Sequence, residues 1–403
     1  MFKLADVSMQ IVYPPNNGGK QAIYQRLMKI SEKNEVAIFM INSEDEKISS
    51  DIDNIKSNIN YYKIYSAVNP PKKKCGKIKL VIQLIKWLYS MKPRMASKII
   101  SKKIRNNITK NIISFGASVV FLETPFIAEA IDFNLLKKNK IKIILVMHNI
   151  ETEFFKAANN WPKFLQSIEE KRIEKYENKI MNLCDYVFCL SPKDACYAKS
   201  IVNANKVKYT PVYLTCPKKQ WQIQNKNKYI IFCGSLAFKP NLQGIEWFLE
   251  NVFKEYIKIY PNVILKITGK VSEVIKQKLS LYKNVEFTGY LSSNNLENMI
   301  IYSSFSVVPI IDGGGVKMKL LESLSYGVPT ITTEHGYNGV GFNEKNIEKM
   351  PFLVSRNKKD FLKYMIMLTE KQDLKNTISK NAREFFKKEY SSDENVNNWI
   401  SFI

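Results

Sequence analysis

Short apolar runs alternate with amphipathic helical patterns over the whole chain. In the first half, the runs that predict strands are residues 7–13, 36–41, 118–122, 141–147 and 186–190. Each run is rich in β-branched or aromatic residues and is followed by a turn or helix signal. Repeated strand and helix units of this kind predict parallel sheets that helices cover on both faces.

The second half of the chain repeats the same pattern. Strands are predicted at residues 229–233, 263–268, 285–287, 304–308 and 330–332. The whole pattern predicts an α/β protein with two doubly wound domains. A polar, proline-containing stretch at residues 213–228 separates the halves, which places the domains at 1–213 and 214–385. The final segment, 386–403, is predicted to be a helix that docks back on the N-terminal domain through its apolar side chains.

The length and the charge of the chain narrow its class. Its 403 residues suit two domains better than a single core. The chain has 61 Lys and Arg residues against 37 Asp and Glu residues, which gives a net charge of +24. A surplus of this size favours nucleic acid, nucleotide phosphates or an anionic membrane face as partners. No nucleic-acid-binding motif accompanies it, so we expect no nucleic acid and keep a basic nucleic-acid-binding protein only as an alternative.

Cysteine usage and the apolar profile indicate a reducing compartment. None of the six cysteines forms a C-x-x-C pair, so structural zinc is not expected and the thiols are predicted to be free. The first residues lack the apolar stretch of a signal peptide, and no window reaches the ~18 apolar residues of a spanning helix. We therefore expect a cytoplasmic protein whose contact with a membrane, if any, is peripheral.

A strongly basic stretch at residues 77–105 has two interpretations. Its apolar side chains recur at helical spacing among lysines, and they are Leu80, Val81, Leu84, Ile85 and Leu88. Such a stripe can lie on an anionic membrane, which would suit a lipid-linked acceptor. It is also the pattern of a helix that packs on the core of the N-terminal domain with its lysines in water.

The most informative segment runs from residue 311 to residue 333. Three consecutive glycines at 313–315 follow a predicted strand, and then a helix begins. Free amides and the positive end of a helix dipole at such a place favour a phosphate or another anion. Lys317 and Lys319 add positive charge, and Glu322 is one turn further on, placed to accept hydrogen bonds from ribose hydroxyls. A glycine-rich turn before a solvated surface helix would have the same composition.

As a whole, this segment resembles the donor-binding block of GT-B glycosyltransferases, the retaining family 4 in particular. The block has the form Gly-Gly-x-(Lys/Arg)-x-Lys-x-x-Glu-(Ala/Ser)-(Leu/Met)-(Ala/Ser)-x-Gly-x-Pro, and residues 314–329 match nearly every fixed position. The resemblance implies two Rossmann-like domains that face a cleft. It also implies that Glu322 contacts the ribose and that Lys319 helps to hold the diphosphate. The amides implied to lie on the sugar and phosphates are those of Gly314, Gly315 and Val316.

One position departs from the family pattern. Many members carry a second glutamate eight residues before the first, beside the reacting sugar, and this chain has Gly314 there. Backbone groups would then contact the sugar hydroxyls, so the nucleotide half of the site is better defined than the sugar half. The full set of expected donor-binding residues is Gly234, Ser235, Lys239, Gly313, Gly314, Gly315, Val316, Lys317, Lys319, Leu320 and Glu322.

Two further segments fit the same family. The turn at Gly234 and Ser235 looks like the first strand-to-helix turn of the family's C-terminal domain, and Lys239 would reach the diphosphate from it. His148 follows a predicted buried strand and begins a His-Asn-x-Glu motif. The motif resembles a family 4 subgroup in which this histidine meets the donor sugar and has a catalytic or substrate role. Glu151 ends the motif and is expected either to cap a helix or to bind the acceptor.

Other candidates lie in neighbouring loops. Gly18 and Gly19 end the first predicted strand-to-helix loop, residues 14–19, which in the family faces the donor phosphates or the acceptor. His335 follows the predicted strand at 330–332. Each also has an ordinary structural interpretation, as a loop glycine or as a structural histidine.

The resemblance implies the reaction as well. A sugar would pass from a nucleotide-sugar donor to a hydroxyl of a glycan or lipid-linked acceptor, with retention at the anomeric carbon, in surface polysaccharide or glycan assembly. No metal and no other cofactor is expected, because lysines and helix dipoles neutralise the leaving diphosphate; Asp51 and Asp53 lie in a polar surface run. A sugar-nucleotide epimerase of the same fold is the alternative, but that class usually has several histidines and carboxylates in its cleft, and this chain has two histidines.

Overall fold

The computed structural model describes residues 1–42, 48–66, 85, 87–98, 101–159, 161–222, 229–342 and 349–401. The chain divides into two compact units. The first comprises Met1–Lys156, Asn160–Leu214 and Asp393–Ile403, and the second comprises Ala157–Asn159 and Thr215–Ser392. The sequence had placed the divisions after residues 213 and 385, and the second of these positions lies inside a helix of the second unit.

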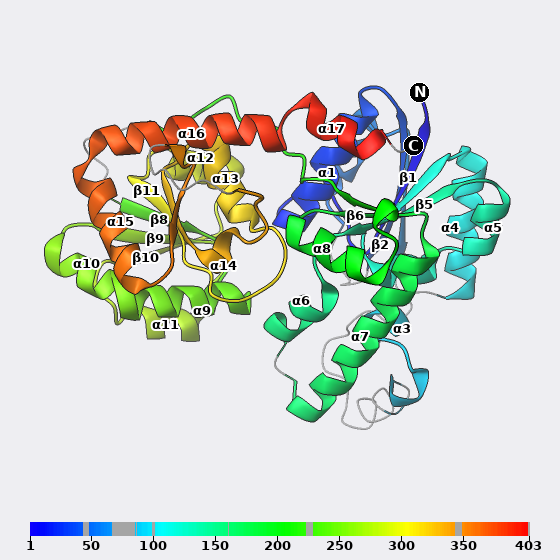
Figure 1. Ribbon diagram of the computed structural model, residues 1–403, viewed down its shortest axis with the longest axis horizontal. Coiled ribbons are helices and arrows are strands. Elements are labelled where there is room, and N and C mark those ends of the chain that lie inside the picture. Colours follow the sequence, from blue (N-terminus) through cyan, green and yellow to red (C-terminus); the bar gives the residue numbers. More distant parts are fainter. Residues whose placement is uncertain are drawn as a thin grey trace. The chain divides into compact units, whose positions relative to one another are not determined.

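A parallel sheet forms the centre of the first unit (Figure 1). Over the described residues its seven strands have the order β3-β2-β1-β4-β5-β6-β7. The strands are β1 (Lys3–Ser8), β2 (Glu35–Asn42), β3 (Tyr61–Ser66), β4 (Val119–Leu122), β5 (Lys142–Met147), β6 (Tyr186–Cys189) and β7 (Val207–Tyr209). The α-helices are α1 (Gly18–Ser31), α3 (Arg94–Lys98), α4 (Lys102–Phe115), α5 (Phe133–Lys138), α6 (Glu151–Ala158), α7 (Lys163–Leu183), α8 (Pro192–Ile201) and α17 (Asp393–Ile400), and the 3-10 helices are Ser50–Ser57, Pro125–Ala130 and Ala204–Lys206.

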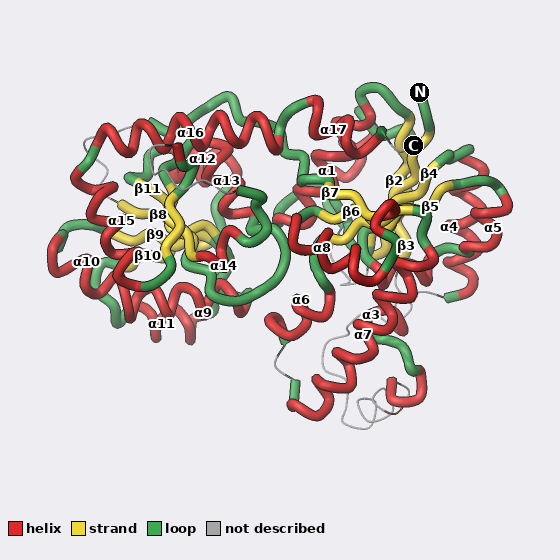
Figure 2. The backbone as a smooth tube through the Cα atoms, in the orientation of Figure 1, coloured by secondary structure: helices red, strands yellow, loops and turns green. Residues whose placement is uncertain are grey.

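The second unit repeats this arrangement, with helices over both faces of a parallel sheet (Figures 1 and 2). Its six described strands have the order β10-β9-β8-β11-β12-β13. The strands are β8 (Tyr229–Cys233), β9 (Ile264–Thr268), β10 (Val285–Gly289), β11 (Phe305–Val308), β12 (Thr330–Thr333) and β13 (Leu353–Ser355). The helices are α9 (Lys239–Phe248), a π-helical turn (Leu249–Phe253), α10 (Lys254–Ile259), α11 (Glu273–Leu279), α12 (Ser293–Ile301), α13 (Met318–Tyr326), α14 (Glu334–Tyr337), α15 (Lys358–Glu370) and α16 (Gln372–Tyr390).

Both sheets have the strand order of a doubly wound α/β fold. Each opens on a strand, β1 or β8, adds strands on one side of it, and then adds the remaining strands on the other side. The predicted fold class is therefore confirmed. In such sheets, ligands bind beyond the carboxyl ends of the strands where the winding direction changes. Here that change lies between β1 and β4 and between β8 and β11.

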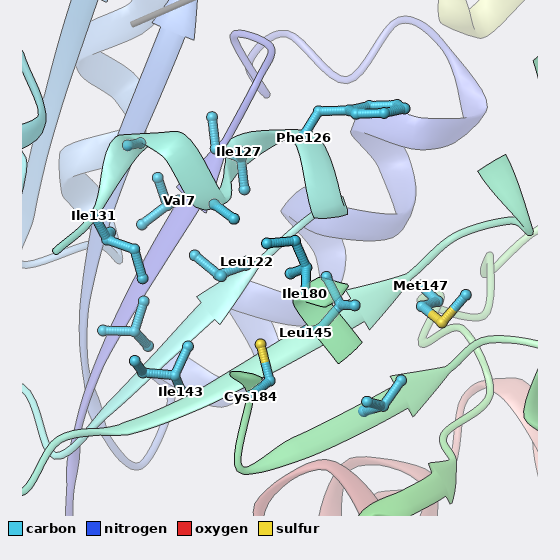
Figure 3. Close-up of a cluster of buried hydrophobic side chains, with 14 of the residues drawn as sticks. Val7, Leu122, Phe126, Ile127, Ile131, Ile143, Leu145, Met147, Ile180 and Cys184 are labelled. Atoms are coloured by element: carbon cyan, nitrogen blue, oxygen red, sulfur yellow. The ribbon is translucent and has the colours of Figure 1, made fainter. Parts of the chain in front are cut away.

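Apolar side chains fix the strands of the first sheet from one face (Figure 3). Leu122 of β4 and Leu145 of β5 belong to one buried cluster with Phe126 of a 3-10 helix and Ile180 of α7. Close packing of this kind leaves little room for the strands to shift. The residues that follow β4 and β5 are therefore held at defined positions.

Strand β1 lies earlier in the chain than the sequence predicted. The prediction was residues 7–13, and the structure has Lys3–Ser8. Asp6 explains the difference, because a charged residue inside a strand looks polar in the sequence pattern. Its side chain is fully buried and pairs with Arg26 of α1. A buried polar side chain requires such a partner, and the partner is 20 residues away.

The last helix, α17, covers part of the first sheet. Its Trp399 is buried against Phe121 and Phe188, at ring-centroid distances of 6.0 and 5.8 Å. The indole Nε1 donates to the backbone oxygen of Pro211 at 3.1 Å. The helix begins at Asp393, whereas the sequence placed the start of this segment at residue 386.

Three described strands, β3, β7 and β13, were not predicted from the sequence. Each lies at an edge of its sheet. Edge strands are covered on fewer sides than central strands, and these three include partly exposed residues. Their apolar signal in the sequence is correspondingly weak.

No helix in the described part of the chain is long and apolar enough to span a membrane. Much of the basic stretch at 77–105 lies outside the described residues, including Leu80, Val81 and Leu84. Among its described residues, Trp87 is buried, whereas Ile85 and Leu88 are exposed. Ala96 is also buried, so the described part contributes side chains to the core and leaves others in water.

Candidate active site

The residues predicted to bind the donor follow the carboxyl ends of strands in the second sheet. Gly234 follows β8, His335 follows β12, and the glycine loop, defined here as residues 313–316, lies between β11 and α13. The strands β8 and β11 flank the change of winding direction. The topology and the sequence motif thus indicate the same edge of the sheet.

Lys317 holds the glycine loop through the backbone. Its ammonium group donates to the carbonyl oxygens of Gly313, Gly314 and Gly315 at 2.8, 2.8 and 3.1 Å. In a trans peptide the C=O and the next N–H point in opposite directions. The amides of Gly314, Gly315 and Val316 therefore point away from Lys317, and within the described ranges none of them donates to a backbone oxygen outside the regular elements. The loop thus leaves three amides directed away from the lysine at the start of α13, an arrangement that suits an anion.

Lys317 makes contacts that the sequence did not predict. The sequence assigned its charge to a bound anion, whereas the structure buries the residue to 8% exposure against the loop carbonyls. An ammonium group has three donors and no acceptor, and three carbonyls surround this one. Lys317 therefore orients the loop through its carbonyls, and a role of its charge toward a bound anion stays a prediction.

His335 and Gly339 hold the loop from further along the chain. His335 Nε2 donates to the carbonyl oxygen of Gly313 at 2.6 Å, so this ring nitrogen carries a hydrogen. A Cβ atom on Gly339 would lie 2.6 Å from the Cα of Val316. Gly313 and Gly315 have φ angles of 102° and 69°, which favour glycine. The loop conformation therefore depends on glycine inside the loop and also at 339.

Lys319 connects the start of α13 to the turn after β8. Its ammonium group donates to Oδ1 of Asn241 at 2.6 Å, and Nδ2 of Asn241 donates to the backbone oxygen of Ser235 at 2.8 Å. Gly234 lies against both, because a Cβ atom there would be 2.9 Å from Nδ2 of Asn241 and 3.1 Å from Cε of Lys319. Two predicted segments, far apart in sequence, thus meet at Asn241 of α9.

Lys319 and Glu322 titrate near neutral pH. Burial and the neighbouring Lys317 lower the pKa of Lys319 to about 8. Burial raises the pKa of Glu322 to about 7, and Lys319 opposes that rise. An anion beside Lys319 would favour its charged form. The pair is therefore suited to a site in which a bound anion adds the missing negative charge.

Other predicted donor residues make contacts within the protein. Ser235 Oγ donates to the backbone oxygen of Lys270 at 3.1 Å. Lys239 Nζ donates to the backbone oxygen of Asn159 at 3.1 Å, and Leu320 is fully buried. These contacts shape the turn after β8 and the base of α13. Direct contact of these three residues with a donor stays a prediction.

In the first unit, His148 ends a network of charged side chains. We call Asp6, Arg26, Glu123 and His148 the His148 network. Nε2 of His148 lies 2.7 Å from Oε2 of Glu123, and Oε1 of Glu123 accepts from Arg26. Arg26 also donates to Asp6 at 3.2 Å. The first three side chains are no more than 2% exposed, whereas that of His148 is 15% exposed. The histidine is therefore the accessible end of a buried network.

The charges of the His148 network are balanced. Burial opposes ionisation of Glu123, but Arg26, His148 and Asp6 together hold the pKa of its carboxyl group below the ordinary value. Burial and the neighbouring Glu123 raise the pKa of Asp6 well above its ordinary value. Burial thus favours the neutral form of Asp6, whereas Arg26 favours the ionised form of Glu123. This balance makes deep burial of the ion pair tolerable.

Glu151 is buried beside two other carboxyl groups. It is the first residue of α6, and its backbone N–H donates to Oε1 of Glu177 at 3.1 Å. Burial, with Glu177 and Asp194 nearby, raises the pKa of Glu151 to about 8. Burial also raises the pKa of Glu177 to about 7. Glu177 therefore caps α6, a role that the sequence offered to Glu151.

Gly18 and Gly19 are the first two residues of α1, where the sequence predicted a loop. The helix starts earlier because Asn17 caps it, accepting from the Lys20 amide at 2.9 Å. A Cβ atom on Gly19 would lie 3.3 Å from Nε2 of Gln10. The glycine pair thus opens a helix beyond the carboxyl end of β1.

No three His, Cys, Asp or Glu side chains are arranged to hold a metal ion anywhere in the described ranges. Asp51 and Asp53 lie in the 3-10 helix Ser50–Ser57, where Asp53 pairs with Lys56 at 2.8 Å. Five cysteines are free, namely Cys184, Cys189, Cys196, Cys216 and Cys233. Cys75 lies outside the described residues.

The residues of these sites that were missed in the sequence include Asp6, Arg26, Glu123 and Asn241. Glu123 had a usable signal, because it is a charged residue directly after a buried strand, as His148 is. Arg26 had none, since its partner Glu123 is 97 residues away. Asn241 lies in the first turn of α9 after the Gly234 turn, and its role depends on a contact with another helix.

Comparison with known proteins identifies a family match within the second unit. Residues 227–371 match the family model for glycosyl transferases group 1. A similar protein from Klebsiella pneumoniae is described as an uncharacterized 44.6 kDa protein in the cps region. The two sequences are 25% identical over 412 residues, and the match covers 97% of each chain. The second unit thus carries a group 1 glycosyltransferase domain.

Solved structures share the fold over the full length. Sucrose-phosphate synthase from Thermosynechococcus elongatus has a TM-score of 0.69 at 12% identity, covering 100% of this chain and 98% of that one. A TarM variant from S. aureus, in complex with fondaparinux, alpha-GlcNAc-glycerol and UDP, has a TM-score of 0.68 at 13% identity, with coverage of 100% and 99%. At these identities the likeness establishes the fold, which is GT-B.

Replacing Lys317 with methionine should loosen the glycine loop. The variant keeps an unbranched side chain but loses three hydrogen bonds to carbonyls, and bonds to a charged group contribute ~1.5–3 kcal/mol each. We expect amide hydrogen exchange at residues 313–317 to become at least ~10-fold faster, with little change in the other helices of the second unit. Lys363→Met, at an exposed position, is the control. Equal exchange in the two variants would show that the loop does not depend on Lys317.

Replacing Glu151 with glutamine should stabilise the protein at alkaline pH. A carboxyl group whose pKa rises from 4.5 to about 8 on folding stabilises the fold below pH 4.5 and loses that contribution as the pH rises to 8. Glutamine does not titrate, so the melting temperature should rise by at least ~2 °C at pH 8 and change little at pH 5. Glu153→Gln, on the exposed side of α6, is the control. A Glu151→Gln effect that is equal at both pH values would contradict this assignment.

Proposed function

We propose that this protein is a retaining, metal-independent glycosyltransferase that moves a sugar from a nucleotide-sugar donor to a hydroxyl of a glycan or lipid-linked acceptor. The glycine loop is the observation that carries the proposal. Its three amides point away from Lys317 at the start of α13, with Lys319 and Glu322 close by. Amides and a lysine suit a diphosphate, and a carboxylate suits ribose hydroxyls.

The comparisons support this choice of substrates. A TarM variant of the same fold was solved in complex with UDP and alpha-GlcNAc-glycerol. The Klebsiella pneumoniae relative is described by its place in a cps region, which supports a role in capsule or other surface polysaccharide synthesis at the cytoplasmic face of the membrane. Retention rests on resemblance to family 4 and on the lack of an evident enzymic nucleophile in the sequence.

The residues have separate roles in the proposed reaction. The amides of the glycine loop and Lys319 stabilise the diphosphate as it leaves, which is the main requirement when no metal is used. Glu322 binds the ribose, and backbone groups at Gly314 contact the sugar. In the first unit, His148 contacts the donor sugar, and the acceptor hydroxyl attacks the anomeric carbon on the face that the diphosphate leaves.

A screen of UDP-, GDP-, ADP- and CMP-sugars by thermal shift, in buffer with EDTA, tests the function. We expect one nucleotide class to stabilise the protein and EDTA to leave that effect unchanged. Glu322→Gln should weaken the binding of that nucleotide about 10- to 100-fold, since a hydrogen bond to a charged group contributes ~1.5–3 kcal/mol. Sugar release should then require an acceptor, which separates transfer from epimerisation.

The matched control is Glu334→Gln, because Glu334 is exposed and pairs only loosely with Arg356 at 3.7 Å. Its nucleotide affinity should equal that of the unmodified protein. Failure of every sugar nucleotide to stabilise the protein would overturn the proposal. Steep, salt-dependent binding of DNA or RNA in the same screen would favour the nucleic-acid alternative instead.

We further propose that the first unit contacts an anionic membrane through the segment at residues 87–95 and the start of α7. Arg172 of α7 donates to the backbone oxygens of Trp87 and Leu88 at 2.8 and 2.9 Å, so the two segments lie together. Tyr89, Met91 and Phe164 are 84%, 75% and 72% exposed. Exposed apolar side chains in a basic segment are the features of an interfacial membrane site.

Vesicle sedimentation tests this contact. The protein should bind vesicles that contain phosphatidylglycerol and should bind weakly to vesicles of phosphatidylcholine alone. A Tyr89→Ser, Phe164→Ser double variant should bind the anionic vesicles at least ~10-fold more weakly, since burying one large apolar side chain contributes ~1.5–3 kcal/mol. Tyr290→Ser, at a 68% exposed position in the second unit, is the control. Unchanged binding of the double variant would refute the contact.

A further inference from the structure

The His148 network constrains which ring nitrogen of His148 carries a proton. Glu123 has its two carboxylate oxygens directed at two different groups, Arg26 on Oε1 and His148 on Oε2. An ionised carboxylate only accepts hydrogen bonds. Nε2 of His148, 2.7 Å from Oε2, must therefore be the donor. In the neutral ring this leaves Nδ1 as a hydrogen-bond acceptor.

We propose that Glu123 is a positioning residue that fixes His148 as the Nε2–H tautomer, and that Arg26 and Trp399 of the C-terminal helix hold Glu123 in place for this purpose. The proposal deepens the proposed function and rests on it in one respect, the contact of His148 with the donor sugar. In that contact, Nδ1 accepts a hydrogen bond from a sugar hydroxyl.

Arg26 is held on several sides, so it can hold Glu123 in turn. Its guanidinium lies over the rings of Trp399 and Phe121, with its Cζ 4.5 and 5.4 Å from their centroids. Asp6 accepts a hydrogen bond from it at 3.2 Å. A planar guanidinium packed against two aromatic rings has little rotational freedom, and this fixes the direction in which it donates.

The C-terminal helix is therefore part of the support for His148. Trp399 is anchored by its hydrogen bond to the Pro211 oxygen at 3.1 Å, and Asn395 of the same helix donates to the Val212 oxygen at 3.4 Å. Both acceptors lie just beyond β7. The contacts run from α17 through Arg26 to Glu123 and end at His148, all within the first unit.

The charge state of the network agrees with this assignment. Arg26 and His148 favour the ionised form of Glu123, and burial favours the neutral form of Asp6. Neutralising Glu123 would remove the acceptor that the Nε2–H tautomer requires. A glutamine at this position would also keep its oxygen toward Arg26, because a guanidinium only donates.

The Glu123→Gln variant therefore gives a sharp test. With its oxygen toward Arg26, the new amide group presents N–H to Nε2 of His148, which must then accept. Long-range proton–nitrogen NMR of the full chain should show the Nε2–H tautomer in the unmodified protein and the Nδ1–H tautomer in the variant. Only two histidines contribute signals, and His148→Gln assigns them.

Activity provides the second measurement. With the donor found by the nucleotide screen, Glu123→Gln should lower kcat at least ~10-fold, because a correctly placed hydrogen-bond acceptor on the sugar is lost. The affinity for the free nucleoside diphosphate should not change, since that site lies in the second unit. Glu169→Gln is the control, because Glu169 is an equally buried carboxylate that contacts Trp87 and Arg94 instead.

Trp399→Leu tests the outer part of the network with a different residue. It removes the ring over Arg26 and keeps an apolar side chain in the core. We expect NMR signatures of both tautomers, together with an intermediate loss of kcat. Retention of the pure Nε2–H tautomer would remove Trp399 from the proposal.

The outcomes separate this inference from the proposed function. If the unmodified protein has the Nδ1–H tautomer, or if Glu123→Gln leaves the tautomer unchanged, the inference is wrong whatever the enzyme does. If the tautomer changes as expected but kcat does not, the positioning role is refuted and the glycosyltransferase proposal still stands on the nucleotide site. A failure to bind any nucleotide would leave the tautomer result unaffected, because the tautomer is measured without substrate.

Discussion

The ammonium group of Lys317 donates to three consecutive carbonyls of the glycine loop, and the site in the second unit depends on this contact. Because each carbonyl points to the lysine, each following amide points the opposite way. A flexible glycine stretch thereby becomes a set of oriented donors at a helix start. His335 and the close approach of Gly339 restrain the same loop from a different segment. Lys319, turned toward Asn241, then remains near the loop with a lowered pKa.

In the first unit, a buried cation orients a side chain, whereas in the second unit it orients a loop. A buried guanidinium, that of Arg26, holds a carboxylate, and the carboxylate orients a partly exposed histidine. In each unit a cation is buried among hydrogen-bond acceptors. The contact with the cation fixes the direction in which a neighbouring polar group points. Both arrangements lie beyond the carboxyl ends of strands where a doubly wound sheet changes direction. The shared strand order explains why the two units place their polar groups at equivalent edges.

The sequence was sufficient for the fold class and for most central strands, because fully buried parallel strands appear as continuous apolar runs. It misplaced β1, since buried Asp6 looks like a surface residue until its pairing with Arg26 is known. For the site, residue types were easier to predict than contacts. Lys317 was assigned to the anion, and only the backbone conformation shows that it binds the loop carbonyls. Arg26 and Asn241 could not be predicted as site residues, because their partners are distant in the chain.

The central claim is that the glycine loop binds the phosphates of a nucleotide. It is tested most directly by calorimetry with the nucleoside, its monophosphate and its diphosphate, for the base that the sugar-nucleotide screen selects and for one other base. If the amides and Lys319 hold a diphosphate, one series should gain at least ~10-fold in affinity with the second phosphate, as charge-assisted hydrogen bonds contribute ~1.5–3 kcal/mol. Equal affinity for the nucleoside and its diphosphate, or no binding by either series, would contradict the account.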